Sequence, residues 1–269
     1  MIAWAAIARG RRDRACKLPA LVRDEEIELL LSPLPSGRHG LPREAVVRSQ
    51  RIRLLRGALH VAARDGYGAM TVTAVIAQAS VSRKTFYELF ADREDCFLAA
   101  YEHVTERALA GLRAELALEA LWSVRVRAGL AWALDALARH PDEAHVAFVE
   151  VLAAGPRALE RRDRFTEQLV KLLADGFEAA PRGVALPAST PTAVVGALSE
   201  LIAAHARRGA MAQLPDALPE MLYCVLAPFL GPAAASEAAG AGAGRVAGGD
   251  GPRGRVDDPR LLAAATTQT

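Results

Sequence analysis

The sequence predicts an all-α protein, with an N-terminal three-helix helix-turn-helix domain followed by a C-terminal helical domain. Alanine and leucine dominate the 269 residues and aromatic residues make up only 5%, a composition that favours helices. Apolar residues recur at helical spacing in one segment after another, and no stretch alternates like a β-strand bounded by turns. We therefore expect residues 42–92 to form the first domain and residues 93–231 the second.

Residues 1–41 are expected to form a disordered N-terminal extension, because prolines and glycines punctuate the stretch before the first helix. Arg38 and His39 directly precede that helix. They suit a flexible arm that enters the minor groove of DNA, and a linker without such a role is the alternative.

The first helix is expected to begin at Pro42, which suits a first helical position, and to end at Asp65 and Gly66. Its apolar residues form one stripe that would pack behind the next two helices: Leu54, Leu55, Ala58, Val61 and Ala62. Its arginines are expected to be solvated, with some near phosphates: Arg48, Arg51, Arg53 and Arg56.

Residues 71–90 predict two short helices joined by a sharp turn, which is a helix-turn-helix. Thr71 and Ser82 stand where a side-chain oxygen caps the start of a helix. Ser80 and Val81 interrupt the apolar spacing between the two helices. The expected core of this domain is Leu55, Val75, Phe86 and Phe90.

The second short helix would present side chains that bind phosphates and base edges. Arg83 and Lys84 are candidate base readers, because arginine to guanine is the commonest specific contact, and either is equally suited to a phosphate. A core that already holds two phenylalanines does not need Thr85 or Tyr87. The full set of expected DNA contacts is Thr71, Ser82, Arg83, Lys84, Thr85, Tyr87 and Arg93.

The amino-acid sequence of this segment is informative beyond its helical spacing. Residues 79–94 read ASVSRKTFYELFADRE, and residues 66–72 read GYGAMTV. Together they resemble the DNA-binding domain of tetracycline-repressor (TetR) family regulators, over about residues 43–105, with a similar general layout over 120–230. Ser80 stands where the family usually has glycine. That position often needs a positive φ, so a slightly strained turn is expected.

The resemblance implies a transcriptional regulator, more often a repressor than an activator, that binds double-stranded DNA as a homodimer. Two recognition helices would enter successive major grooves of a near-palindromic operator. An unidentified small-molecule effector would enter the C-terminal domain and shift the fourth helix, which releases the DNA. The operator sequence, the effector and the sign of regulation are not written in the residues.

Charge is distributed unevenly along the chain. Residues 43–93 hold nine basic and four acidic side chains, a balance of +5, whereas residues 94–269 hold 17 basic and 22 acidic ones, a balance of −5. The basic excess falls on the helix-turn-helix, as expected of a nucleic-acid-binding module. A solvated basic face is the alternative.

The second domain is predicted to consist of amphipathic helices, and the tail after it, residues 232–269, to be disordered, because its Ala, Gly, Arg and Asp cannot bury enough apolar surface. Asp92 is expected to cap the first of these helices, supported by Asp95. The expected spans are Asp92–Ala117, Val124–Ala138, Asp142–Ala154, Ala158–Ala179, Pro191–Arg208 and Pro215–Leu230.

The last two of these helices are predicted to form an antiparallel hairpin that makes the dimer as a four-helix bundle, the arrangement of the resembled family. The expected interface residues are Leu198, Leu201, Ile202, His205, Leu222, Val225 and Phe229. Five aromatic residues are candidates for lining an effector pocket: Trp122, Trp132, Phe148, Phe165 and Phe177. Aromatic residues at helical spacing more often form plain core, which is the alternative for these five.

Several function classes lack support in the residues. No catalytic triad, nucleophile elbow, phosphate-binding loop or carboxylate pair stands out, so we expect neither an enzyme nor a cofactor. Three widely spaced cysteines and the pair His140 and His145 predict no metal site and suit a reducing cytoplasm. No apolar run reaches the ~18 residues of a membrane span. The rival interpretation is a helical ligand-binding protein or adaptor whose helix-turn-helix is only structural.

Overall fold

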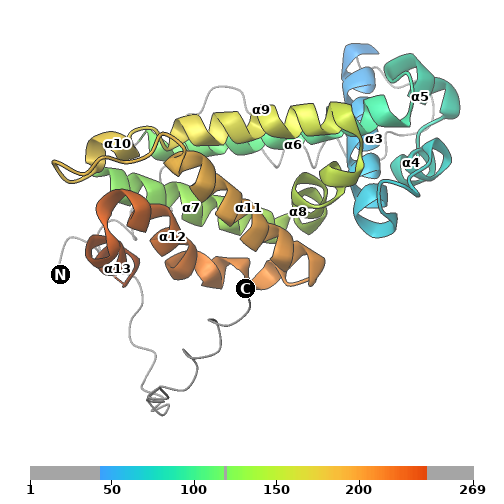
Figure 1. Cartoon of the computed structure of the whole chain (residues 1–269). Coiled ribbons are helices and arrows are strands. Elements are labelled where there is room, and N and C mark those ends of the chain that lie inside the picture. Colours follow the sequence, from blue (N-terminus) through green and yellow to red (C-terminus); the bar gives the residue numbers. More distant parts are fainter. Residues whose placement is uncertain (1–42, 118–119, 241–269) are drawn as a thin grey trace, which may run out of the picture.

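The computed structural model describes residues 43–117 and 120–240, and these residues form helices and no strand (Figure 1). The predicted all-α class is confirmed. The elements are α3 (Arg43–Asp65), α4 (Val72–Ala79), α5 (Arg83–Leu89), α6 (Arg93–Leu116), α7 (Trp122–Arg139), α8 (Pro141–Phe148), the 3-10 helix η1 (Glu150–Ala153), α9 (Pro156–Leu172), α10 (Gly176–Ala179), α11 (Thr190–Arg207), the 3-10 helix η2 (Met211–Ala217), α12 (Leu218–Leu230) and α13 (Pro232–Gly240).

Helices α3, α4 and α5 form a small domain at one end of the molecule (Figure 1). All four residues predicted for its core are buried: Leu55, Val75, Phe86 and Phe90. Gly57 allows α3 and α4 to approach closely, because a Cβ at this position would lie 3.0 Å from the carbonyl oxygen of Val75. The apolar stripe of α3 therefore packs behind the helix-turn-helix, as predicted.

Helix α6 joins the small domain to the larger one. The Asp92 side chain caps it by accepting a hydrogen bond from the Asp95 backbone N–H at 2.8 Å, which confirms the predicted start. Cys96 and Phe97 of its first turns are buried in the core of the small domain. The rest of α6 runs beside α9 into the larger domain (Figure 1). A displacement of α6 would thus be felt in both domains.

The larger domain is layered around α7, which packs between α6 on one side and α12 and η2 on the other. One buried cluster gathers around Trp122, Leu222 and Phe229. A second cluster gathers around Leu134, Leu214 and Met221. The predicted amphipathic segments therefore supply the core of this domain.

Three predicted helices are divided in the structure. Segment Asp142–Ala154 becomes α8 and η1, since the backbone of Val149 leaves the helical region with φ −120° and ψ −63°. Segment Ala158–Ala179 becomes α9 and α10. Segment Pro215–Leu230 becomes the end of η2 followed by α12, with Pro219 in the first turn of α12 as its fixed φ allows.

The prediction that the tail is disordered from residue 232 is wrong for residues 232–240, which form α13. Ala235 and Ala239 are buried against α12, and the Arg127 guanidinium donates to the carbonyls of Ala238 and Ala239 at 2.6 and 3.0 Å. Small alanine side chains let α13 lie close to α12, a benefit that a count of large apolar residues misses. Residues 1–42 and 241–269, which include Arg38 and His39, lie outside the described residues.

Candidate DNA-binding site

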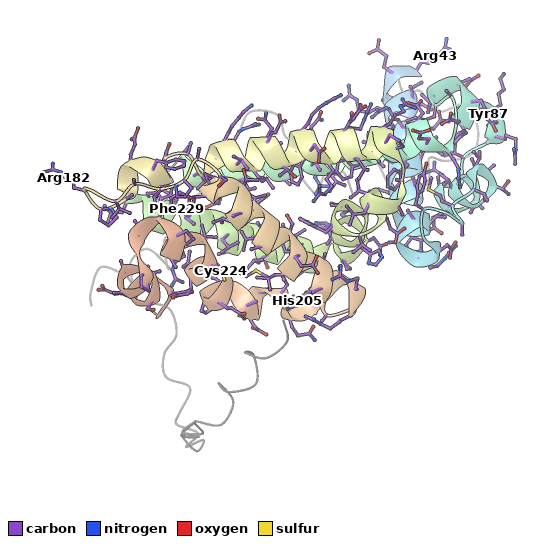
Figure 2. The ribbon with its side chains drawn as sticks, viewed as in Figure 1. Arg43, Tyr87, Arg182, His205, Cys224 and Phe229 are labelled. Atoms are coloured by element: carbon purple, nitrogen blue, oxygen red, sulfur yellow. The ribbon has the colours of Figure 1, made fainter. Side chains whose placement is uncertain are left out.

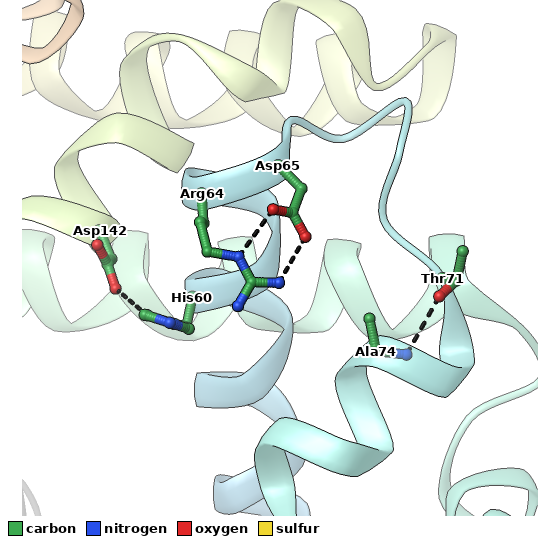
Figure 3. Close-up of polar contacts among 6 residues, drawn as sticks. All are labelled: His60, Arg64, Asp65, Thr71, Ala74 and Asp142. Carbon is green, nitrogen blue, oxygen red and sulfur yellow. Dashed lines mark hydrogen bonds and ion pairs between the residues drawn. The ribbon is translucent and has the colours of Figure 1, made fainter.

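Two hydroxyl side chains begin the two helices of the helix-turn-helix. Thr71 Oγ1 accepts a hydrogen bond from the Ala74 backbone N–H at 3.1 Å, which starts α4 (Figure 3). Ser82 Oγ accepts one from the Thr85 N–H at 3.0 Å, which starts α5. Both predicted caps are confirmed. Thr71 thus begins α4 and Ser82 begins the recognition helix α5, and the DNA contacts predicted for both residues stay predictions.

The turn between the helices passes through Ser80, which has φ 50° and ψ 48°. It is the only non-glycine residue with positive φ among the described residues. The Ser80 N–H donates to Ala77 at 3.2 Å and the Val81 N–H to Ile76 at 3.1 Å, so the turn is fully hydrogen-bonded. A positive φ is unfavourable for a residue with a Cβ, so the backbone strain expected from serine at this position is present.

Arg53 stabilises this turn from α3. Its Nη2 donates to the carbonyl oxygens of Ala79 and Ser80 at 2.6 and 2.7 Å. A positive charge is favourable at the C-terminal end of a helix, where carbonyls lack intrahelical partners. The expectation that Arg53 is simply solvated is therefore wrong: this side chain holds α4 and the turn against α3.

Helix α5 turns one face to the core and the other outward. Phe86 is fully buried, whereas Tyr87 is 53% exposed and projects from the end of the molecule (Figure 2). Arg83 is exposed, and its Nη2 donates to Thr73 Oγ1 at 2.7 Å, which orients its guanidinium. The Lys84 ammonium is 3.9 Å from Glu88 in a loose surface pair. Cationic and hydroxyl groups thus gather on the outward face.

The structure gives Arg93 a structural role, and its predicted DNA contact stays a prediction. Its Nη1 donates to the carbonyl oxygens of Gly68 and Met70 at 3.2 and 2.6 Å, and its guanidinium lies 5.2 Å from the centre of the Tyr67 ring. This side chain therefore secures the loop before α4. The sequence did not reveal this role, because the carbonyls that Arg93 binds are brought together only by the fold of that loop.

Polar contacts fasten the small domain to the larger one. His60 Nδ1 of α3 lies 2.8 Å from Asp142 Oδ2 of α8 (Figure 3). The Tyr67 backbone N–H donates to Glu150 Oε2 at 2.6 Å, and Glu150 Oε1 lies 3.2 Å from His145 Nε2. These contacts between the domains could not be predicted from the sequence, because no pattern in the chain links positions about eighty residues apart.

The five aromatic residues proposed for an effector pocket are not brought together. Trp122 and Phe177 pack edge-to-face on Phe229, with ring centroids 5.1 and 5.8 Å away. Trp132 covers Gly111 on α6. Only Phe148 and Phe165 share a cleft, which lies between α6, α8, α9 and α11. The core interpretation therefore fits Trp122, whereas Phe177 is 39% exposed beside Phe229, and a pocket role for Phe148 and Phe165 stays a prediction.

The hairpin residues predicted for the dimer interface fall into two groups, one buried inside the protomer and one half-buried. Ile202, Leu222, Val225 and Phe229 are buried inside the protomer, so they cannot meet a second copy. Helices α7 and α13 pack on α12, so the apolar stripe of α12 is buried within the protomer. Leu198, Leu201 and His205 are half-buried. We define the outward face of the hairpin by its exposed or half-buried residues Ala193, Ala197, Leu201 and Ala204 on α11 and Tyr223, Cys224 and Ala227 on α12, which include the predicted Leu201.

No cluster of three or more metal-ligating side chains occurs within residues 43–117 and 120–240. Burial raises the pKa of the Cys96 thiol to about 12, so this cysteine stays protonated. None of the described helices is long and apolar enough to cross a membrane.

Residues 54–100 match the family model of bacterial regulatory proteins of the tetR family. The chain carries a TetR-family DNA-binding domain. It is therefore a DNA-binding transcriptional regulator, and the matched residues include the capped helices, the strained turn and the exposed face of α5. The sequence has no match among curated proteins.

Solved structures extend the likeness to the second domain of this chain. The fatty acid degradation regulator FadR from Bacillus halodurans has a TM-score of 0.60 at 16% identity and covers 66% of this chain and 94% of its own. FadR from Bacillus subtilis, solved with stearoyl-CoA, has a TM-score of 0.59 at 15% identity, covering 67% and 98%. A TetR family regulator from Marinobacter aquaeolei VT8 has a TM-score of 0.51 at 14% identity, covering 66% and 97%. At these identities the likeness shows a shared fold.

Proposed function

We propose that this TetR-type protein is a homodimeric, cytoplasmic repressor that binds a near-palindromic operator and leaves it when a small-molecule effector binds the helical domain. The observation that carries the proposal is the outward face of α5. Arg83, Lys84 and Tyr87 are exposed whereas Phe86 is buried, and all four lie on the segment with the basic excess. Such a face fits the major groove, with Arg83 held by Thr73 in a defined orientation.

A dimer is proposed because one helix-turn-helix reads only one half-site, and the two-fold axis sets the ~34 Å between successive major grooves. The outward face of α11 repeats Ala193, Ala197, Leu201 and Ala204 at helical spacing. Small side chains allow two helices to approach closely. Tyr223, 38% exposed on α12, adds a larger apolar contact beside them.

Release by an effector is proposed from the way the domains are joined. Helices α6 and α8 both pack on α3, and both extend into the larger domain. A ligand that binds better to a conformation with these helices displaced would lower the fraction of DNA-competent protein. The Bacillus subtilis FadR structure contains a ligand, stearoyl-CoA, which supports a ligand-binding role for a domain of this fold.

The test is a gel shift of the full chain with the DNA that flanks its own gene. We expect a specific complex on the full operator and a much weaker one on an isolated half-site. Tyr87→Ala should weaken the complex, whereas Tyr223→Phe, which stays apolar on the proposed dimer face, should not. A protein that binds no flanking fragment, or binds full and half-sites equally, contradicts the proposal.

A further inference from the structure

A narrow cleft in the larger domain combines apolar walls with polar side chains, one of which, Tyr101, is fully buried. It lies between α6, α8, α9 and α11 and has a volume of about 90 Å³. Phe148, Leu152, Phe165 and Leu169 supply apolar walls, and Tyr101 lines the cleft from α6. Thr166, Ser199 and Glu200 also line it, so apolar walls and polar groups meet in one cleft between helices, a common place for a small-molecule site.

The buried polar group is the hydroxyl of Tyr101. The residue is 1% exposed, and its hydroxyl has no hydrogen-bond partner among the described residues. Burial raises the pKa of Tyr101 and the nearby Arg162 guanidinium lowers it, with burial the larger effect. The phenol therefore keeps its proton and is a donor without an acceptor. Buried polar groups in folded proteins almost always have a partner, so this hydroxyl is available to donate to an acceptor atom of a ligand.

A positive charge lies at the same cleft. Arg162 lines it from α9, and its Nη1 donates to Asp163 Oδ1 at 3.3 Å. A guanidinium has five N–H donors, and a contact of this kind between exposed neighbours is weak. Glu200 also lines the cleft, and Arg207 binds its carboxylate at 2.5 Å in an exposed pair. The Tyr101 hydroxyl and the Arg162 guanidinium are thus the hydrogen-bond donors that the cleft offers to an anionic group.

We propose that this cleft is the effector site and that the effector is a small aromatic carboxylate, which rests on the proposed function above. The ring would lie against Phe148 and Phe165, and the carboxylate would accept hydrogen bonds from the Tyr101 hydroxyl and the Arg162 guanidinium. A closed cavity of about 150 Å³ is known to hold benzene. This cleft, at about 90 Å³, is smaller, so the ring would enter it only partly. The remainder extends past Gly196, where a Cβ would meet no atom within 4 Å.

The position of the cleft links the ligand to the DNA-binding domain. Tyr101 belongs to α6, whose first turns are buried in the small domain. Phe148 belongs to α8, which packs on α3 and carries the Asp142 partner of His60. A ligand with its carboxylate at Tyr101 and its ring at Phe148 would therefore contact both helices that pack on α3.

Isothermal titration of the full chain tests the site, with benzoate as the probe and benzyl alcohol as its uncharged comparator. Benzoate should bind, and benzyl alcohol should bind at least about 10-fold more weakly, because it lacks the charge-assisted hydrogen bonds. Tyr101→Phe and Arg162→Gln should each weaken benzoate binding about 10-fold. Arg164→Gln, two residues further along α9 and paired with Glu160 outside the cleft, should leave it unchanged.

A thermal melt separates a binding role from a structural one. Tyr101→Phe should keep or raise the melting temperature without ligand, since it removes a buried hydroxyl that has no partner. Benzoate should raise the melting temperature of the unmodified chain but not that of Tyr101→Phe or Arg162→Gln at the same concentration.

The following outcomes overturn the proposal: millimolar benzoate that gives no heat, equal affinity for benzyl alcohol, or benzoate affinity unaffected by both variants. The gel shift with flanking DNA separates a failure of the effector assignment from a failure of the proposed repressor function. A chain that binds DNA but not benzoate contradicts the effector assignment alone. A chain that binds benzoate as described but never binds DNA contradicts the repressor function and leaves the cleft assignment standing.

Discussion

Ser80 and Arg53 together determine the turn that orients the recognition helix. Serine in the left-handed region costs roughly 1–2 kcal/mol compared with glycine. Two hydrogen bonds from a charged guanidinium to the carbonyls of Ala79 and Ser80 act in the opposite direction. The turn is therefore kept by a contact from another helix rather than by its own residue type.

Arg53→Ala should lower the free energy of unfolding by about 1–3 kcal/mol, because a charged donor is removed from two carbonyls. It should also weaken DNA binding, since α5 is no longer fixed. Ser80→Gly should raise the stability and reduce the cost of Arg53→Ala in a double-mutant cycle. Thermal denaturation checks these values, with the exposed Arg56→Ala on the same helix as control. Equal costs of the two arginine variants would contradict this role for Arg53.

Arg83 and Tyr87 are expected to contribute to DNA binding in different ways. Arg83→Ala should relax the preference at one operator position and cost about 1–3 kcal/mol there, because a bidentate contact to a base is lost. Tyr87→Phe should weaken all sequences about equally, because a hydroxyl bound to phosphate carries no base information. Affinities for a panel of single-base operator variants check both. A change of base preference in Tyr87→Phe alone would reverse the two roles.

At the scale of elements, the packing of α6 on α7 depends on a glycine. A Cβ at Gly111 would lie 2.0 Å from ring atoms of Trp132, so any larger residue forces that ring to move. This contact matters for function because α6 reaches the DNA-binding domain. The separation of α6 and α7 is thus set by one small residue facing one large one.

Gly111→Ala should reduce the free energy of unfolding by about 1–3 kcal/mol through overpacking, although alanine is the better helix former. Gly196→Ala is the matched control within α11, since its Cβ would meet nothing within 4 Å. That control should gain about 0.5–1 kcal/mol from helix propensity. Urea denaturation of both variants checks the prediction, which fails if they change stability in the same direction.

The elements that sequence reasoning identified best were those with a strong local signal. Thr71, Ser82 and Asp92 were recognisable as caps because capping depends on residues three apart. The roles of Arg53, Arg93 and Glu150 could not be predicted, because their partners are backbone groups brought near by folding. The stripe of α12 was identified correctly, but periodicity does not say whether a stripe faces the protomer's own core or a partner.

At the scale of the whole molecule, the proposed operator binding requires two copies held by the outward face of α11 and α12. Ala197→Glu should place a charge in that contact and yield a monomer, because an unpaired buried charge is costly. Light scattering and circular dichroism should show a helical monomer that no longer binds the full operator. Val184→Glu, at an exposed loop position, is the control and should stay dimeric. A dimer in both variants would locate the interface elsewhere.

The most direct test of the central claim, that α5 binds DNA largely by electrostatic contacts, is the salt dependence of operator affinity. The logarithm of the binding constant should fall linearly with the logarithm of salt concentration, with a slope of about −0.9 for each phosphate neutralised. Lys84→Gln should reduce the magnitude of that slope by about one phosphate, whereas Lys171→Gln in the last turn of α9 should not. A flat salt dependence, or equal slopes for the two lysine variants, would contradict the account.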